Sequence, residues 1–498
     1  MRTSSQRSVS RRVMAAAAVA LAVVAGSVVT TAAATAQPDS NRAKNVIYLV
    51  GDGMGRNHVD AARIRYYGAD GRLAMETLPV VGQVTTYAIQ KNSGQPGEDD
   101  FVPEYVTDSA SSATAWASGV KSYNAALGVD GKGEVVPTLM ELAKDAGYRT
   151  GNVSTAEITD ATPASQASHV IARGCQGPDY SAAACQDLAI TGEPLPTDDV
   201  RVTPVADQMA RNGTADVVLG GGLARFDAAD QEALEAQGYD VLGSFADQTV
   251  ATSEELENAE GRKVFGLFSR GNLTIEKFKR ENPDSVQAEE PSVAELTTEA
   301  ISLLKGSRKG FYLQVEGALI DKRTHANDAA QALEEMKAFD EAVRVALNFA
   351  KKDGNTTVIV TADHETGGFN IVGKGMVTNP ETLTPPANVD SGNPANSSTP
   401  SRASSGALDP TRSTGPINGS GSSDPGNFAP ATFRTADDPE GVEDGSPEAS
   451  LWLTFLTGHH TGANVPIFAY GPGTQSLAAT VDNTDLFDVM GRALRVTR

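Results

Sequence analysis

The sequence predicts an α/β protein in which a mostly parallel central sheet is covered by helices on both faces. Apolar, β-branched runs that are typical of buried strands alternate with helical stretches, the longest of which covers residues 328–350. Acidic residues and histidines follow several of these runs, at the strand ends where open α/β sheets bind ligands. Because these residues extend from position 52 to position 460, we expect one large domain over residues 37–498.

The first expected strand covers residues 45–50, and the segment Gly-Asp-Gly-Met-Gly that follows it turns the chain sharply. Asp52 lies in this turn and has two interpretations, an acid that forms the turn or a metal ligand at the strand end. The glycines do not have the spacing Gly-x-Gly-x-x-Gly, so we do not expect a dinucleotide-binding loop.

Asp108, Ser109 and Ala110 open a run of small residues that is typical of the first turn of a helix. Two interpretations are open for this motif: Asp108 is an ordinary helix cap, or Ser109 is a nucleophile that takes up a phosphoryl group. A helix N-terminus has free backbone N–H groups and a partial positive charge, and both attract a phosphate. The motif alone does not decide between the two.

A strand-like run over residues 310–313 is followed by a segment that contains Glu316, Asp321 and His325. Asp321 and His325 are four residues apart, so both side chains would point to one side of a helical turn. An oxygen and an imidazole donor that converge in this way suit zinc, whereas Glu316 offers the hard oxygen that magnesium prefers. A solvated charged face is the alternative interpretation.

Other expected strands also lie next to candidate ligands: residues 149–153 precede Asp160 and Thr162, residues 356–361 precede Asp363 and His364, and residues 465–470 follow His460. Four of the six histidines fall in these clusters if His459, the neighbour of His460, is counted, which is more typical of metal sites than of isolated structural histidines. The histidines for which we expect no ligand role are His58, His169 and His459.

In these motifs and in their order, the sequence resembles the bacterial alkaline phosphatases that use two zinc ions and one magnesium ion. The resemblance runs from about Lys44 to the C-terminus, apart from a long insertion. It implies the alkaline phosphatase fold, with Ser109 as the nucleophile that forms a covalent phosphoserine. It also implies that Arg173 grips the phosphate, because the guanidinium fork binds two oxygens in a way that lysine does not match.

The resemblance implies a ligand set for each metal ion. It assigns one zinc ion to Asp321, His325 and His460, the other zinc ion to Asp52, Asp363 and His364, and the magnesium ion to Asp52, Thr162 and Glu316, with Asp160 contacting the magnesium through water. Asp160 and Lys322 match the magnesium-using form of the family. The best-known members have a second histidine two residues after the Asp-His pair, where this sequence has Thr366.

The function that the resemblance implies is hydrolysis of small-molecule phosphate monoesters, with highest activity at alkaline pH, by a homodimer. Two other functions remain open on the same fold, a phosphodiesterase and a phosphatase dedicated to one phosphorylated metabolite. A third alternative is an exported zinc-binding protein without turnover. Ser109 and Arg173 argue against this last function, because metal capture needs neither residue.

Residues 1–36 are expected to be a signal peptide, so we expect a secreted protein, either extracellular or in the periplasm or cell envelope. Four arginines precede an apolar run over residues 15–29, and Ala-Thr-Ala at 34–36 offers a cleavage site. A permanent membrane anchor is the alternative, but the run is short and rich in alanine. The arginine pair at 11–12 would fit a twin-arginine signal.

The chain has a formal net charge of −22, and removal of the leader makes it more acidic still. No basic patch of the kind that binds nucleic acids is expected, so metal ions and Arg173 must supply the local positive charge for a phosphate. From residue 378 to 448 the composition shifts to Pro, Ser, Gly, Asn and Asp. We expect a loop-rich insertion near the active site, which is either a lid or dimer contact or a tolerated surface segment.

Cys175 and Cys185 are the two cysteines of the chain. A close pair in an exported protein favours a disulfide, and the resemblance implies one at this place. A two-cysteine metal site is the alternative. Neither cysteine has the Cys-x-Pro-x-Arg setting of formylglycine sulfatases, so that chemistry is not expected.

Overall fold

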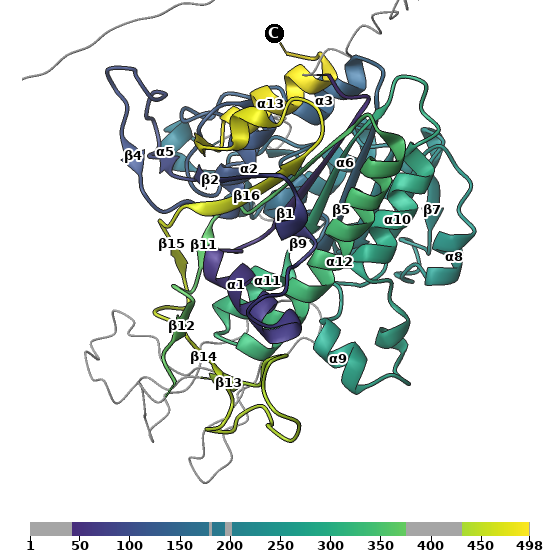
Figure 1. Ribbon diagram of the computed structural model, residues 1–498. Helices are drawn as coiled ribbons and strands as arrows, with labels where there is room; N and C mark the ends of the chain where they lie inside the picture. The colour runs from purple at the N-terminus through teal and green to yellow at the C-terminus, as the bar shows by residue number, and fades with distance from the viewer. Residues whose placement is uncertain (1–41, 179–181, 195–201, 375–430, 498) are drawn as a thin grey trace, which may run out of the picture. The chain divides into compact units, whose positions relative to one another are not determined.

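The computed structural model describes residues 42–178, 182–194, 202–374 and 431–497. At its centre is a ten-stranded sheet (Figure 1). Its strands follow one another across the sheet in the order β17 (Thr480–Asp482), β2 (Val80–Thr85), β16 (Val465–Tyr470), β10 (Thr356–Thr361), β1 (Asn45–Gly51), β9 (Phe311–Gly317), β5 (Arg149–Glu157), β6 (Val217–Gly221), β8 (Val264–Leu267) and β7 (Asp240–Leu242).

The sheet is mostly parallel, as the sequence predicts. From β10 across to β7, every pair of neighbouring strands is parallel. On the other side of β10, strand β16 is antiparallel to both of its neighbours, and β17 is parallel to β2. The central strands β1, β9, β5 and β10 are buried along their whole length, which explains their continuous apolar and β-branched composition.

Helices cover both faces of this sheet (Figure 1). On one face, α12 (Ala329–Asp353) packs on β1, β9 and β10, and α10 (Val293–Leu304) packs beside it on β5, β6 and β9. On the other face, α2 (Ser109–Ser118), α3 (Leu139–Asp145) and α13 (Asp485–Leu494) contact one another, with α3 against β5 and β9 and α13 against β1. The fold class predicted from the sequence is therefore confirmed.

Shorter elements complete the described chain. The remaining α-helices are α1 (Arg56–Tyr67), α4 (Ala161–Ala164), α5 (Leu188–Thr191), α6 (Val205–Asn212), α7 (Ala228–Ala236), α8 (Ser253–Glu257), α9 (Glu276–Glu281) and α11 (Leu319–His325). The 3₁₀ turns are η1 (Met75–Thr77), η2 (Ala182–Cys185), η4 (Leu223–Arg225), η5 (Val286–Glu289) and η8 (Gln475–Leu477). Small sheets pair β3 (Ala88–Ile89) with β4 (Pro103–Glu104), β11 (Glu365–Thr366) with β15 (His460–Thr461), and β14 (Leu451–Thr454) with both β12 (Asn370–Val372) and β13 (Ala431–Phe433).

The strand order brings the candidate ligands to one edge of the sheet. The parallel strands β10, β1, β9 and β5 are consecutive neighbours, so their carboxyl ends meet side by side. Strand β16 runs the opposite way, and its first residue therefore lies at the same edge. This reversal explains how His460, five residues before β16, reaches the ligands that follow the parallel strands.

Buried contacts fix α2 against the sheet. Trp116 is 1% exposed, and its indole N–H donates to Gln314 Oε1 of β9 at 3.1 Å. The Trp116 ring also packs on Tyr48 of β1, with the ring centroids 5.5 Å apart. Large aromatic contacts of this kind contribute both apolar burial and a defined geometry. They hold the helix that begins at Ser109 over the strands that carry the candidate ligands.

Most of the Pro/Ser/Gly-rich stretch at 378–448 lies outside the described residues, and so does the expected signal peptide at 1–36. The end of the stretch is described and contains β13, where Ala431 and Phe433 are buried. The composition predicts loop here because a three-residue strand leaves no periodic pattern. Within the described ranges, no helix is both long enough and apolar enough to cross a membrane.

Candidate active site

Ser109 is the first residue of α2, and the side chain of Asp108 caps this helix by accepting from the Ser111 N–H at 3.0 Å. Ser109 is 4% exposed, and its Oγ lies 3.2 Å from Nε2 of His364. The two interpretations of the motif are therefore compatible. Asp108 is the helix cap, and the cap leaves the hydroxyl of Ser109 directed at the histidine cluster.

Asp321, His325 and His460 lie together at the carboxyl edge. Asp321 and His325 are one turn apart on α11, as their spacing predicts, and His325 Nε2 is 3.2 Å from Asp321 Oδ2. His460 Nε2 is 3.0 Å from His325 Nε2 and 3.7 Å from Asp321 Oδ1. Backbone carbonyls hold the outer ring nitrogens, since Nδ1 of His325 contacts Gly458 O and Nδ1 of His460 contacts Thr107 O. The inner ring nitrogens therefore face Asp321.

Asp52, Asp363 and His364 form a second group beside the first. His364 Nε2 lies 3.0 Å from Asp363 Oδ2 and 3.6 Å from Asp52 Oδ1. Asp52 follows β1 and Asp363 follows β10, so the pairing of these two strands brings the carboxylates together. The N–H of Gly53 donates to Asp363 Oδ1 at 2.9 Å and leaves Oδ2 directed at the group.

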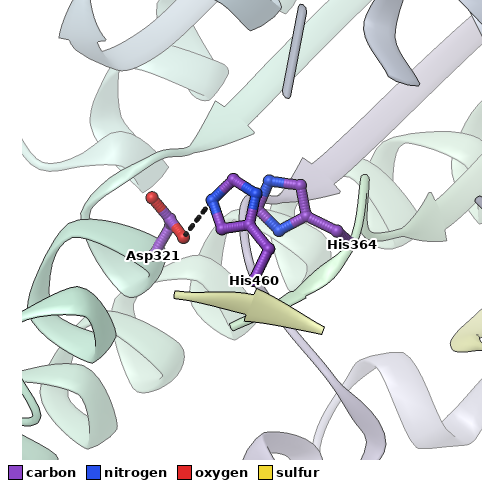
Figure 2. Close-up of side chains that lie close together, drawn as sticks. All are labelled: Asp321, His364 and His460. Atoms are coloured by element: carbon purple, nitrogen blue, oxygen red, sulfur yellow. Dashed lines mark ion pairs between the residues drawn. The ribbon is translucent and has the colours of Figure 1, made fainter. Parts of the chain in front are cut away.

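The donor atoms of the two groups lie next to each other. The ring of His364 stacks on that of His460, with centroids 3.5 Å apart. Figure 2 shows both rings beside Asp321, and one donor atom from each of these three residues lies within 4.8 Å of the others. The grouping thus differs in one respect from the sequence-based ligand sets, because His364 faces the first group as well as the second.

The expected magnesium ligands other than Asp52 come from β9 and from the helix that follows β5. Glu316 is the penultimate residue of β9, and its Oε2 accepts from Ser154 Oγ of β5. Thr162 lies in α4, directly after β5, and is 1% exposed. Glu316 and Asp52 raise each other's energy when both are charged, and the charge of Glu316 contributes to the raised pKa of Asp52.

Buried atoms without partners test whether these residues fit metal ions. In the described part of the chain, Asp52 Oδ1, Asp363 Oδ2 and Thr162 Oγ1 are buried and have no hydrogen-bond partner. A buried polar atom without a partner costs about 1–3 kcal/mol, so native proteins rarely keep several in one place. The first two groups offer mixed oxygen and nitrogen donors, which suit zinc, and Thr162 with its neighbours offers oxygen alone, which suits magnesium. The residues fit the metal ions that the sequence predicts.

Burial and neighbouring charges shift the pKa values of the acids among the candidate ligands. Burial, followed by the charge of Asp363, raises the pKa of Asp52 well above its ordinary value. Burial raises the pKa of Glu316 to about 8. Burial acts in the same direction on Asp321, but its histidine neighbours, His325 first, outweigh it and hold the pKa of Asp321 low. A bound cation would stabilise the ionised form of each acid.

Arg173 has two carboxylate partners. Its Nη1 donates to Asp108 Oδ2 at 3.1 Å, and its Nη2 donates to Asp160 Oδ1 at 2.7 Å. Lys322 Nζ donates to the other oxygen of Asp160 at 2.7 Å. Burial opposes the ionised form of Asp160, but Lys322 and Arg173 outweigh it and hold the pKa of Asp160 far below its usual range. The Arg173 side chain is 29% exposed, so it is accessible to a ligand.

A disulfide joins Cys175 and Cys185, as expected, two residues beyond Arg173. The N–H of Arg173 donates to Ala125 O at 2.7 Å, and the N–H of Cys175 donates to Ala172 O at 3.0 Å. These contacts fix the backbone on both sides of the arginine. The alternative interpretation, a two-cysteine metal site, is therefore wrong.

The other histidines have structural contacts. His58 is buried, accepts from the Gly55 N–H at 3.1 Å and stacks on Phe369, and burial lowers its pKa to about 3. His169 contacts Gly128 O at 2.7 Å and Glu141 Oε1 at 2.8 Å. His459 is exposed, and its carbonyl accepts from the Gly367 N–H. All three interpretations from the sequence agree with these contacts.

Sequence reasoning missed residues that hold the candidate ligands in place. Ser154 contacts Glu316 only because β5 and β9 pair in a register that places the two residues opposite each other. Asp108 was expected as a cap or as a neighbour of the nucleophile, and its bond to Arg173 depends on a loop 65 residues away. No local sequence pattern predicts either contact. A search for hydroxyl residues on strands next to predicted ligands would have identified Ser154 as a candidate.

A serine at a helix N-terminus, groups of aspartate and histidine, and a clamped arginine together define a hydrolase that transfers a phosphoryl group. The particular family follows from comparison with known proteins. A family model of the alkaline phosphatases matches residues 43–406, which is more than half of the chain. The chain belongs to the alkaline phosphatase family, and it is a phosphomonoesterase.

Individual relatives agree with this assignment. The alkaline phosphatase of Escherichia coli K12 is 40% identical over 364 residues, which cover 67% of this chain and 72% of that protein. Streptomycin-6-phosphate phosphatase of Streptomyces griseus is 38% identical over 369 residues, which cover 67% and 76%. A solved structure of a variant of the alkaline phosphatase from the Antarctic bacterium TAB5, with Mg bound in its M3 site, superposes with a TM-score of 0.61 at 25% identity and covers 92% of this chain and 99% of its own.

Proposed function

We propose that the protein is an exported, metal-dependent alkaline phosphatase that hydrolyses phosphate monoesters through a covalent phosphoserine on Ser109. The observation that carries this proposal is the position of Ser109 Oγ, buried at a helix N-terminus and 3.2 Å from Nε2 of His364. A serine in a structural cap would not need this neighbour. The helix N-terminus, together with the metal ions that the adjacent ligand groups would hold, would provide the positive potential that a transferred phosphoryl group requires.

The ligand sets of the proposal are those that the family likeness implies and that the donor atoms fit. One zinc ion is assigned to Asp321, His325 and His460, the second zinc ion to Asp52, Asp363 and His364, and the magnesium ion to Asp52, Thr162 and Glu316, with Asp160 in contact through water. When bound, the zinc ions stabilise charge on the attacking and leaving oxygens, and magnesium orders the ligands behind them. The TAB5 relative with Mg in its M3 site supports the third metal.

The chain's own residues account for substrate binding and the two chemical steps. Arg173 grips two phosphate oxygens with its fork, while Asp108 and Asp160 hold the guanidinium plane in position. Ser109 Oγ loses its proton and attacks the phosphorus, the new O–P bond forms as the ester O–P bond breaks, and the leaving oxygen takes up a proton and departs as the alcohol. Water then loses a proton and attacks the same phosphorus, the Ser109 O–P bond breaks, inorganic phosphate leaves, and Ser109 regains its proton. Alkaline pH favours both attacks because each nucleophile must lose a proton.

The setting of the enzyme is part of the same proposal. Export by the signal peptide at residues 1–36 rests on the arginines and the apolar run that follows them. The Cys175–Cys185 disulfide agrees with an oxidising compartment. Small-molecule phosphate monoesters are the proposed substrates, and a homodimer is the proposed assembly.

Replacement of Ser109 by alanine tests the covalent mechanism. We expect turnover of p-nitrophenyl phosphate to fall by about three or more orders of magnitude, with zinc content unchanged, because only direct attack by water remains. Labelled phosphate trapped at acid pH should mark the wild-type protein on Ser109. Ser118→Ala is the matched control, since Ser118 lies at the far end of the same helix, where its Oγ donates to Thr114 O and accepts from the Val120 N–H. An unlabelled Ser109, or full activity of the alanine variant, would falsify the mechanism.

A phosphatase dedicated to one metabolite is the second candidate, and the 38% identity to streptomycin-6-phosphate phosphatase favours it over the phosphodiesterase. The two candidates differ in selectivity. A general phosphatase should hydrolyse p-nitrophenyl phosphate, sugar phosphates and aminoglycoside phosphates with similar kcat/KM. A kcat/KM at least about 100-fold higher for one aminoglycoside phosphate would favour the dedicated enzyme. Turnover of bis-p-nitrophenyl phosphate above that of the monoester would favour the phosphodiesterase.

A further inference from the structure

Thr366 lies between the two groups of candidate zinc ligands. It is the second residue of β11, where it pairs with His460 of β15, and its side chain is fully buried. Its backbone N–H donates to Gly53 O at 3.2 Å, in the turn that carries Asp52. This backbone pairing alone ties Thr366 to segments from both groups.

The side chain of Thr366 contacts one residue from each group. Its Oγ1 donates to Asp321 Oδ1 at 2.5 Å and lies 3.2 Å from Nδ1 of His364. A hydroxyl has one proton, and an ionised carboxylate only accepts. The proton of Thr366 therefore goes to Asp321, and the contact with His364 requires the ring to donate from Nδ1. This arrangement keeps the proton on Nδ1 and leaves Nε2 free to face Ser109 and Asp363.

The space around the hydroxyl is closed. A Cβ atom added to Gly53 would lie 2.7 Å from Thr366 Oγ1 and 2.8 Å from Asp321 Oδ1, and Gly53 has a φ of +70°. The turn after β1 therefore packs directly against the contact between Thr366 and Asp321. A hydroxyl held in this way has one set of partners, and its loss would leave both of them without a substitute.

We propose that Thr366 is a positioning residue that couples the two zinc sites, because one hydroxyl orients Asp321 in the first and fixes the tautomer of His364 in the second. The inference rests on the ligand assignment of the proposed function. Groups that hold metal ligands from behind change metal affinity by about 10- to 100-fold when they are removed. Here a single group acts on ligands of two ions, so its removal should weaken both.

The test compares Thr366→Val, which keeps the shape and removes the hydroxyl, with Thr366→Ser, which keeps the hydroxyl. Both dissociation constants for zinc are measured by competition with a chelator on the full chain, and stoichiometry is measured by elemental analysis. We expect Thr366→Val to weaken the binding of both zinc ions by about 10- to 100-fold. The zinc affinities of Thr366→Ser should stay within a few-fold of those of the wild type. Thr357→Val is the matched control, because Thr357 is also a buried threonine with one hydrogen bond, to Pro472 O, at the opposite end of β10.

Each outcome separates this inference from the proposed function. If the wild type binds two zinc ions and Thr366→Val binds both with unchanged affinity, Thr366 has no positioning role. Weaker binding of only one of the two zinc ions would show that Thr366 does not couple the two sites. If Thr357→Val weakens zinc as much as Thr366→Val, the effect is a general loss of stability and the inference is wrong. A wild type that binds no zinc would instead overturn the ligand assignment of the proposed function.

Discussion

The two halves of the site differ in how the charge of their buried carboxylates is balanced. Around Asp52, Asp363 and Glu316, carboxylates lie close together, two of their oxygens have no hydrogen-bond partner in the described structure, and burial raises the pKa of Asp52 and Glu316. Around Asp160, the chain supplies its own cations, because Lys322 and Arg173 each bond to one carboxylate oxygen. The first half therefore depends on added cations, whereas the second half is balanced within the chain.

This difference separates what folding alone prepares from what metal binding completes. The Arg173 clamp has its geometry before any ligand arrives, because two carboxylates hold the guanidinium and a disulfide lies two residues away. The ligand half has its residues in place, but its charges repel until cations bind. Perturbation of each half should therefore have different consequences.

Removal of the metal ions should have the largest effect. We expect a chelator to lower activity by about three or more orders of magnitude, because charge on the reacting oxygens is no longer stabilised. The metal-free protein should also lose stability as pH rises. The pKa of Glu316 is raised from 4.5 to about 8, so the stability it contributes is complete below about pH 4.5 and is lost as pH rises towards 8.

Thermal unfolding of the metal-free and metal-replete proteins between pH 5 and pH 9 measures this effect. The difference in Tm should widen with pH, since bound cations keep the carboxylates ionised without penalty. An equal difference at all pH values would show that the carboxylates of this half are balanced in some other way.

Arg173→Ala should have the next largest effect, on phosphate affinity. The lost contact is a charge-assisted, two-pronged interaction, so inhibition by inorganic phosphate should weaken by about 10- to 100-fold. Zinc content should not change, because Arg173 contacts no proposed zinc ligand. Arg225→Ala is the control, since Arg225 pairs with Glu157 beside the site. Unchanged phosphate inhibition in Arg173→Ala would mean that another group grips the phosphate.

Asp160→His should shift metal preference by a smaller amount. It replaces an oxygen donor by nitrogen and removes the partner of Lys322. We expect the variant to need several-fold more magnesium for full rate and to bind zinc in its place. Wild-type enzyme that is stripped and given zinc alone should regain part of its activity, and magnesium should restore the rest. Full recovery on zinc alone, in buffer checked by elemental analysis, would contradict a magnesium site.

The smallest effect should come from the pair of His169 and Glu141, which lies outside the ligand half. Burial opposes the charge of His169, but Glu141 outweighs it and raises the pKa of His169. Burial also opposes the charge of Glu141, but His169 and Thr138 outweigh it and lower the pKa of Glu141. The stability from His169 is present below about pH 6.5 and lost as pH rises through its folded pKa, and that from Glu141 is lost as pH falls below about 4.5.

His169→Gln should therefore lower the free energy of unfolding by about 1 kcal/mol near pH 6 and by less at pH 9. A double-mutant cycle with Glu141→Gln at both pH values isolates the pair from the contact of His169 with Gly128. A coupling energy that is the same at pH 6 and pH 9 would mean that charge has no part in this contact.

Several strands and the convergence of the ligands were predictable from local pattern. The expected strands at 45–50 and 356–361 correspond to β1 and β10, and the expected strand at 465–470 is β16. The expected helix at 328–350 corresponds to α12, which extends to Asp353. Buried parallel strands leave long apolar runs, and long helices leave long periodic runs, so both are visible in sequence. The three-residue strand β13 was not, because it is too short for a period.

The sequence by itself predicted which residues are candidates for the chemistry and which strand ends present them, because ligand types and strand periodicity are local properties. Tertiary structure alone decided how these residues are connected. The bond of Asp108 to Arg173 and that of Thr366 to Asp321 join segments that are far apart in the chain. Such contacts depend on strand order and register, and the free energy that fixes them comes from burial of the whole sheet.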